Sequence, residues 1–388
     1  MVFYRRLGEV PHKRHTQFRK PDGSLYAEEL MGEEGFSSDA SLLYHHHLPT
    51  AIVAAEAVER EPDELTPNHP LLPRHFRSHE LKIGGDVVES RELLLANDDV
   101  RLSYVAAEQP SELYRNAVGD ECVYVESGRG RLESVFGVLP VGPGDYVVIP
   151  TSTTHRWVPE GDEPLRCLTV EAGGHIRPPK RYLSERGQFL EHSPYCERDL
   201  RAPEELLHVE EEGVDVLVRH RTGWTRYTYA HHPFDVVGWD GALYPYALNI
   251  ADFEPITGRI HQPPPVHQTF AGPNFVICSF VPRKFDYHPE AIPAPYNHAN
   301  VDSDEVLFYC GGDFMSRRGA GIELGSLSLH PGGFTHGPQP GSVEASIGKE
   351  ATDETAVMVD TFRPLHLGPG ARDTEVDDYP WTWSRNGG

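Results

Sequence analysis

Short runs in which apolar residues alternate with others recur along the chain, and they indicate β-strands. Two examples are residues 122–125, Cys-Val-Tyr-Val, and residues 146–149, Tyr-Val-Val-Ile. Such runs are bounded by Gly and Pro, and the 36 Gly and 34 Pro of the sequence are scattered as turn residues are. Many short strands separated by such turns are typical of a sandwich or a barrel. We therefore predict an all-β protein.

An internal repeat gives these strands a larger organisation. Residues 114–128 read YRNAVGDECVYVESG, and residues 296–312 read YNHANVDSDEVLFYCGG. In each copy an Asp-Glu pair leads into an apolar strand, and a Gly follows that Glu after six intervening residues. Each copy is followed by a second half in which Pro precedes a histidine by five positions, Pro150 before His155 and Pro331 before His336. The repeat predicts two similar domains, residues 1–200 and residues 201–388.

Three residues of the second copy, His298, Glu305 and His336, are candidate metal ligands. Two imidazoles and one carboxylate close one face of an ion and leave other positions open, which suits Fe(II) that binds oxygen and substrate together. Asp304 competes with Glu305 as the carboxylate. The repeat favours Glu305, because both copies keep the same spacing from Glu to Gly. Asp304 is expected to face the other side of the strand entrance, solvated or hydrogen-bonded.

The first copy has an incomplete set of such residues. Tyr114 stands at the position of His298, so that only Glu121 and His155 remain as possible ligands. Two ligands rarely hold a catalytic metal, and we expect the first domain to be structural, with no metal. A second, weak metal site is the alternative.

The two-part motif resembles that of the cupin superfamily, in which His-x-His, a short gap and Glu precede a segment with a last His. The resemblance implies two jelly-roll barrels in one chain, a bicupin. The two halves of each motif would lie on neighbouring strands, with their inward side chains in one barrel. Asn300 replaces the middle cupin histidine of the second copy, which leaves a further metal position open.

Other segments narrow the resemblance to one family. Residues 328–330, Ser-Leu-His, followed by residues 335–338, Thr-His-Gly-Pro, resemble the second metal motif of homogentisate 1,2-dioxygenases. Residues 25–32 and residues 233–246 resemble two further segments of that family. The resemblance therefore spans most of the chain.

Membership of that family implies Fe(II) as the cofactor, with O₂ and homogentisate, a small aromatic acid, as substrates. The product would be maleylacetoacetate, in tyrosine and phenylalanine breakdown, and the protein would be a homo-oligomer, a trimer or a hexamer. The resemblance gives His261 as the base that takes the phenolic proton, with His267 as the rival. It places His330 near the substrate, where it would hydrogen-bond the substrate or orient a metal ligand.

The residues around the motif do not decide the substrate. Arg283 and Arg317 flank the motif strands and could hold a substrate carboxylate, but each could equally be an ordinary solvated or salt-bridged arginine. Phe314 stands where the family usually has Tyr, so one hydrogen bond, commonly worth about 1 kcal/mol, is lost. The alternatives are a gentisate-like dioxygenase, which usually keeps three histidines, and a non-catalytic bicupin that binds a metal or a small molecule.

The net charge argues against two classes of partner, and the cysteines and apolar runs bear on where the protein is located. The net charge of −24 argues against nucleic acids and anionic membranes, which both require a basic surface. The five cysteines are scattered without a CxxC pair, which fits reduced thiols. Apolar runs of the length of a signal peptide or a membrane span do not occur. We predict a cytoplasmic protein, in which residues 45–47, three consecutive histidines, are not expected to bind metal.

Overall fold

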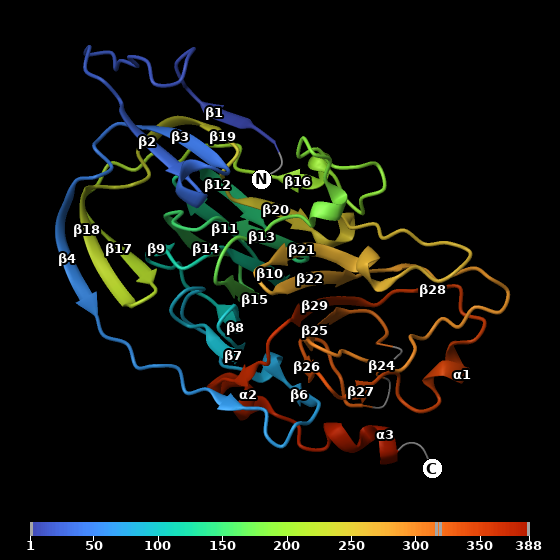
Figure 1. Cartoon of the computed structure of the whole chain (residues 1–388). Coiled ribbons are helices and arrows are strands. Elements are labelled where there is room, and N and C mark those ends of the chain that lie inside the picture. Colours follow the sequence, from blue (N-terminus) through green and yellow to red (C-terminus); the bar gives the residue numbers. More distant parts are fainter. Residues whose placement is uncertain (1–2, 315–316, 318–319, 386–388) are drawn as a thin grey trace.

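The computed structural model describes residues 3–314, 317 and 320–385, and most of its regular structure is β-strand (Figure 1), as predicted. Three short α-helices lie in the last fifth of the chain: α1 Ser342–Ser346, α2 Pro369–Thr374 and α3 Thr382–Arg385. Short 3-10 turns connect many strands: η1 Glu34–Phe36, η2 Ser78–Glu80, η3 Lys180–Tyr182, η4 Glu197–Asp199, η5 Ile250–Asp252, η6 Pro264–His267 and η8 Tyr379–Trp381. No helix within the described ranges is long and apolar enough to cross a membrane.

Two large sheets form the first barrel. One has nine strands in the order β16-β20-β13-β10-β15-β8-β7-β30-β5, and the other has seven in the order β12-β11-β14-β9-β17-β18-β4. The strands of the nine-stranded sheet are β5 Thr66–Pro67, β7 Glu92–Ala96, β8 Val100–Ala107, β10 Glu121–Ser127, β13 Asp145–Ile149, β15 Leu165–Ala172, β16 Leu200–Arg201, β20 Tyr246–Asn249 and β30 His366–Leu367. Those of the seven-stranded sheet are β4 Ile52–Val58, β9 Leu113–Asn116, β11 Arg129–Ser134, β12 Gly137–Val141, β14 His155–Glu160, β17 Glu212–His220 and β18 Gly223–His231.

The second barrel has one six-stranded sheet, in the order β21-β22-β29-β25-β26-β6, and two short strand pairs, β23-β28 and β24-β27. Its strands are β6 Arg74–Phe76, β21 Gln268–Gly272, β22 Phe275–Phe280, β23 Arg283–Lys284, β24 His298–Ala299, β25 Asp304–Gly311, β26 Leu327–His330, β27 Thr335–His336, β28 Ala351–Thr352 and β29 Thr355–Thr361. A separate four-stranded sheet, in the order β1-β19-β3-β2, contains β1 Arg5–Gly8, β2 Ala27–Gly32, β3 Ala40–His45 and β19 Val236–Gly241.

The internal repeat is visible in the strand pairing. β10 of the first copy lies between β13 and β15, and β25 of the second copy lies between β26 and β29, with antiparallel pairing in every case. Strands from both halves of the chain nevertheless share sheets. β20 pairs with β13, whereas β6, from near the N-terminus, pairs with β26. The sheets thus contain strands from both sides of residue 200, and the domain boundary that the repeat places there stays a prediction.

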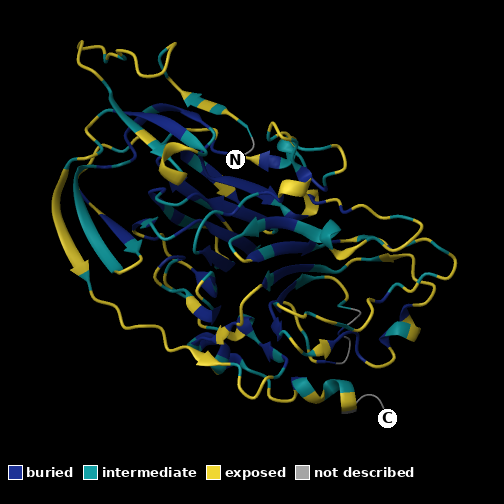
Figure 2. Cartoon of the chain, viewed as in Figure 1, coloured by how far each residue is buried: buried dark blue, intermediate teal, exposed yellow. Residues whose placement is uncertain are grey.

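The two barrels share one hydrophobic core, which is why their central strands are buried on both faces (Figure 2). The ring of Phe308 on β25 lies 6.3 Å from Tyr124 and 6.0 Å from Tyr104 of the first barrel. Successive side chains of a strand point to opposite faces, so Val306 and Phe308 pack between the barrels and Glu305 points into the second one. Packing between the barrels thus sets the direction of Glu305.

Replacing Phe308 with Ala should lower the free energy of unfolding by about 3–5 kcal/mol, since it removes a fully buried ring and leaves a cavity between the barrels. Urea unfolding followed by circular dichroism measures the change. Val301→Ala, at a residue that is 90% exposed, is the control and should stay within about 0.5 kcal/mol. A loss of less than about 1 kcal/mol for Phe308→Ala would show that the barrels do not depend on this contact.

Candidate metal centre

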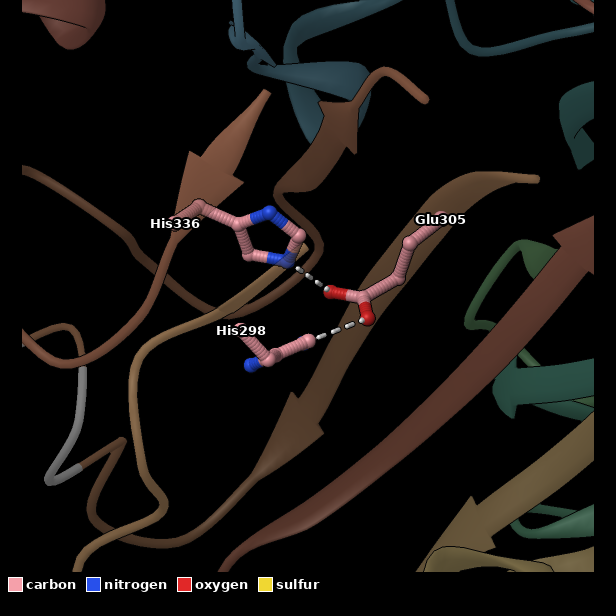
Figure 3. A group of neighbouring side chains, drawn as sticks. All are labelled: His298, Glu305 and His336. Carbon is pink, nitrogen blue, oxygen red and sulfur yellow. Dashed lines mark hydrogen bonds and ion pairs between the residues drawn. The ribbon is translucent and has the colours of Figure 1, made fainter. Parts of the chain in front are cut away.

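Three side chains from three strands meet inside the second barrel (Figure 3). His298 of β24 is paired directly with His336 of β27, and Glu305 lies near the start of β25. Nε2 of His298 is 3.3 Å from Oε2 of Glu305, and Nε2 of His336 is 3.2 Å from Oε1. One ligand atom from each residue lies within 4.8 Å of the other two. The three residues predicted as ligands are therefore brought together.

Backbone contacts determine which ring nitrogen of each histidine faces Glu305. Nδ1 of His298 donates to the carbonyl oxygen of Tyr296, and Nδ1 of His336 donates to that of Phe334, both at 3.2 Å. A carbonyl accepts hydrogen bonds only, so each Nδ1 carries a hydrogen, and in the neutral ring each Nε2 then carries a lone pair. Two neutral rings would thus direct lone pairs at a carboxylate, so the contacts require either a proton on Nε2 or a metal ion between the atoms.

The electrostatics of the three groups agree with this geometry. Burial by itself would raise the pKa of Glu305, but hydrogen bonds from His298, His330 and His336 hold it well below its usual value. The hydrogen bond to Glu305 raises the pKa of His298. Glu305 is therefore a buried anion, and His336 is fully buried beside it, whereas 32% of the His298 side chain is exposed. The exposed edge of the centre lies at His298.

His330 lies behind Glu305 and is fully buried. Its Nδ1 donates to Oε1 of Glu305 at 2.9 Å, and its Nε2 accepts from the hydroxyl of Tyr379, also at 2.9 Å. Its ring stacks on His336 with the centroids 4.4 Å apart. Burial lowers the pKa of His330 to about 3, so the ring is neutral. Of the two roles expected for His330, these contacts support the positioning of a metal ligand.

His261 and His267, the two candidates for the base, have different environments. His261 is exposed, its Nδ1 lies 3.2 Å from Oδ2 of Asp286, and its ring meets the edge of Tyr296 at 5.4 Å. Tyr296 in turn lies 6.2 Å from His298. His267 donates from Nδ1 to the carbonyl of Ser279, and burial lowers its pKa to about 3. Tyr296 thus connects His261 to the exposed edge of the centre.

The two arginines considered for substrate binding are held by the protein. Arg317 is buried, its Nε donates to the Tyr309 hydroxyl at 3.3 Å, and its guanidinium donates to the carbonyl of Gly337. It therefore braces the residue that follows His336. Arg283 is partly buried and donates weakly to the carbonyl of Val281 at 3.4 Å. Phe314, in place of the family tyrosine, packs against the ring of Tyr309 at 4.9 Å.

Asp304 points away from the centre, as alternation along β25 requires. Its Oδ1 accepts from the backbone N–H of Gly332, and its Oδ2 accepts from that of Leu365, both at 2.8 Å. Both bonds fasten loops around the second barrel. Of the two environments expected for Asp304, hydrogen-bonded and solvated, the structure has the first, because the residue is buried.

The equivalent position in the first barrel holds a cation that belongs to the protein. Glu121 is buried and accepts from Arg91 and from Asn116, each at 2.8 Å. Arg91 also lies 3.1 Å from Glu171, on the strand next to Glu121. Burial would raise the pKa of Glu121, but the positive charge of Arg91 lowers it to about 2. This permanent ion pair supports a structural role for the first barrel.

Other clusters of ligand-type residues are already paired. Glu33, Asp120 and His175 lie close together, but Arg177 pairs with Glu33 and the N–H of Ile176 donates to Asp120. Among the consecutive histidines, His45 is buried between Asp235 and Glu29, at 2.7 and 3.0 Å. Hydrogen bonds to carboxylates account for the position of His45.

Two residues next to the centre escaped the sequence analysis. Tyr379 belongs to the C-terminal segment, and its distance from the motifs along the chain hides its contact with His330. Asp360 on β29 is paired directly with Glu305, and burial together with the charge of Glu305 raises its pKa to about 7. Extending the repeat by one strand would have identified Asp360, since residues 168–172, LTVEA, correspond to residues 357–361, VMVDT.

Comparisons with known proteins show a matching family, similar sequences and a similar solved structure. Residues 103–171, from β8 to β15, match the cupin domain family. A protein of Saccharolobus solfataricus named "Putative dioxygenase" is 42% identical over 389 residues, which cover 99% of each chain. Homogentisate 1,2-dioxygenases of Rhodopseudomonas palustris and Bradyrhizobium diazoefficiens are each 27% identical, over 70% of this chain and 62% of theirs. A solved cupin 2 barrel protein from Leptotrichia buccalis is 10% identical, covers 75% of this chain and 97% of its own, and has a TM-score of 0.34.

Replacing Arg91 with Met should lower the free energy of unfolding by about 3–5 kcal/mol at pH 7, because Glu121 is then left buried without its arginine, whereas Glu171 keeps Arg219. Without the guanidinium, burial raises the pKa of the Glu121 carboxyl above the unfolded value, so the penalty shrinks as the pH falls through that raised pKa. Urea unfolding at pH 7 and pH 5 measures both effects.

The control for this prediction is Arg363→Met, which removes a half-exposed partner of Asp99 and should cost about 0–1 kcal/mol. If Arg91→Met were no more destabilising than this control, the cation would not be needed in the first barrel.

Proposed function

This chain belongs to the homogentisate 1,2-dioxygenase family of cupins, and we propose that it is an Fe(II)-dependent dioxygenase that cleaves the ring of a hydroxy-aromatic acid. One observation carries the proposal most directly. The Nε2 atoms of His298 and His336 face the carboxylate of Glu305 at 3.3 and 3.2 Å, an arrangement that needs a proton or a metal ion between the atoms.

The donor set fits a divalent ion of the iron type. Two neutral imidazoles and one carboxylate form a 2-His-1-carboxylate set, which leaves positions open for other ligands. Fe(II) held by these residues would bring O₂ and a phenolic oxygen together and stabilise the negative charge that develops on them.

The surrounding residues prepare the three ligands. The Tyr379 hydroxyl donates to His330, and His330 donates to Glu305, so this chain of hydrogen bonds holds the carboxylate in place. Arg317 fixes the backbone after His336. A metal displaces protons from such a site, which the low pKa of Glu305 favours.

We assign the phenolic proton to His261. Asp286 lies at Nδ1 of His261, which leaves Nε2 free to accept a proton, and Tyr296 places this histidine beside the exposed edge of the metal centre. His267 uses its Nδ1 within the protein and is buried, so it is the weaker candidate.

Homogentisate is the first substrate to test, because the more distant relatives are homogentisate 1,2-dioxygenases. O₂ insertion would then give maleylacetoacetate, as in tyrosine and phenylalanine breakdown. Gentisate is the alternative, since Phe314 changes one polar contact of the family pattern. A homo-oligomer, a trimer or a hexamer, and a cytoplasmic location stay predictions, and all five cysteines are free thiols.

Fe(II)-loaded protein should consume O₂ with homogentisate and much less with gentisate, because Asn300 stands in place of the third cupin histidine that gentisate-type enzymes usually keep. Parallel measurements with an oxygen electrode, with apo-protein as the control, test this. Uptake with gentisate alone would change the substrate, and a lack of uptake with any hydroxy-aromatic acid would favour a binding protein.

Variants of the centre should separate metal binding from proton transfer. His298→Ala and Glu305→Ala should each abolish turnover and lower iron content while the protein stays folded, because each removes one of three ligands. His261→Ala should keep its iron and lose roughly 100-fold or more in kcat, as is usual for a general base. Iron analysis, circular dichroism and oxygen uptake give the three readouts. Retained activity in His298→Ala or Glu305→Ala would show that the ligand assignment is wrong.

A further inference from the structure

We propose that Asp360 is a fourth functional residue of the metal centre, a positioning residue whose carboxylate accepts a hydrogen bond from a hydroxyl group at an open metal position. The hydroxyl belongs to water in the resting protein and, before His261 takes the phenolic proton, to a phenolic substrate in the complex. The inference rests on the proposed metal centre and deepens it, because it assigns a hydroxyl-bearing ligand to one side of that centre.

Strand register places Asp360 beside the ligands. Glu305 on β25 is paired with His330 of β26 on one side and with Asp360 of β29 on the other. Residues that are directly opposite one another on neighbouring strands share a face of the sheet. His330, Glu305 and Asp360 therefore form one row that points into the second barrel, with Glu305 in the middle.

The two neighbours of Glu305 differ in their hydrogen bonds. Both ring nitrogens of His330 have partners, Glu305 and Tyr379. Oδ1 of Asp360 is buried and has no hydrogen-bond partner among the residues that the structure describes. A buried carboxylate oxygen without a donor is costly, so a donor that is not part of the chain is expected at this position.

The first barrel shows what such a pair of carboxylates faces. Glu121 is paired with Glu171 in the same register in which Glu305 is paired with Asp360. Arg91 lies between the two acids of the first barrel and donates to Glu121 at 2.8 Å, with Glu171 at 3.1 Å. Arg91 is thus one positive group that contacts both carboxylates, and Glu171 also pairs with Arg219 and Arg101. In the second barrel a metal ion that carries a hydroxyl ligand would serve Glu305 and Asp360 in the same way.

Geometry favours contact through a hydroxyl group over direct coordination. The ligand atoms of His298, Glu305 and His336 lie within 4.8 Å of one another, and Asp360 is not part of that group. A water or a phenolic oxygen bound to the ion would extend from the centre toward Asp360 and donate its hydrogen there. Such partners of metal-bound groups tune affinity without being ligands.

The first test uses the full-length apo-protein and Co(II) alone. Asp360→Leu should bind Co(II) roughly 10-fold or more weakly than the native protein in competition with a chelator, because the bound water loses its acceptor. Asp360→Asn, which keeps one acceptor oxygen and loses the charge, should fall between the two. Asp302→Asn removes a charge from an exposed residue just before β25 and should bind Co(II) as the native protein does.

Stability of the apo-protein separates this role from a structural one. If Asp360 acts on the metal-bound hydroxyl, Asp360→Leu should unfold at the same urea concentration as the native apo-protein or a higher one, since a buried oxygen without a donor is removed. Weaker Co(II) binding with unchanged apo stability supports the proposal. Co(II) binding within twofold of native in both Asp360 variants, or a loss of apo stability in both, overturns it.

The second test measures ligand binding to the Co(II) protein without oxygen. Asp360→Leu should weaken homogentisate much more than phenylacetate, which lacks the ring hydroxyls, whereas equal losses for the two ligands would overturn the hydroxyl assignment. If the native Co(II) protein bound no homogentisate, the proposed substrate would fail, and the Co(II) affinities would still decide the role of Asp360.

Discussion

The buried charge of Glu305 is the constraint on which the second barrel depends. Packing between the barrels turns this carboxylate inward, where burial alone would favour its neutral form. Hydrogen bonds from three histidines hold it ionised, and two of them, His298 and His336, need a proton or a metal ion between Nε2 and the carboxylate. The same geometry thus explains why the residue is an anion and why the position suits a metal ion.

The first barrel meets the same constraint with a side chain. Glu121 occupies the position of Glu305, and the guanidinium of Arg91 supplies the positive charge next to it. Tyr114 lies against His155 with the rings 5.4 Å apart, at the place where the second barrel has two histidines together. One barrel therefore keeps its own cation, and the other brings together the three residues that we propose as ligands of an exchangeable one.

Segments distant in sequence complete the second barrel. Tyr379, from the C-terminal segment, supports His330, and β6, from residues 74–76, extends the sheet that carries Glu305. Strand β30 crosses in the other direction and pairs with β7 of the first barrel. The candidate metal centre is consequently coupled to the packing of the whole chain, although its three proposed ligands all lie within the second copy of the repeat.

Periodicity and the internal repeat were sufficient for much of this description. They predicted an all-β chain and selected His298, Glu305 and His336 as candidate ligands. They also matched each motif Glu with the histidine of the second half of its motif. These residues have a fixed spacing along the chain, which can be recognised from the sequence. Only the tertiary structure decided what surrounds these residues. Arg91 and Tyr379 reach the two centres from segments outside the repeat, and contacts of that kind between distant segments leave no spacing in the sequence.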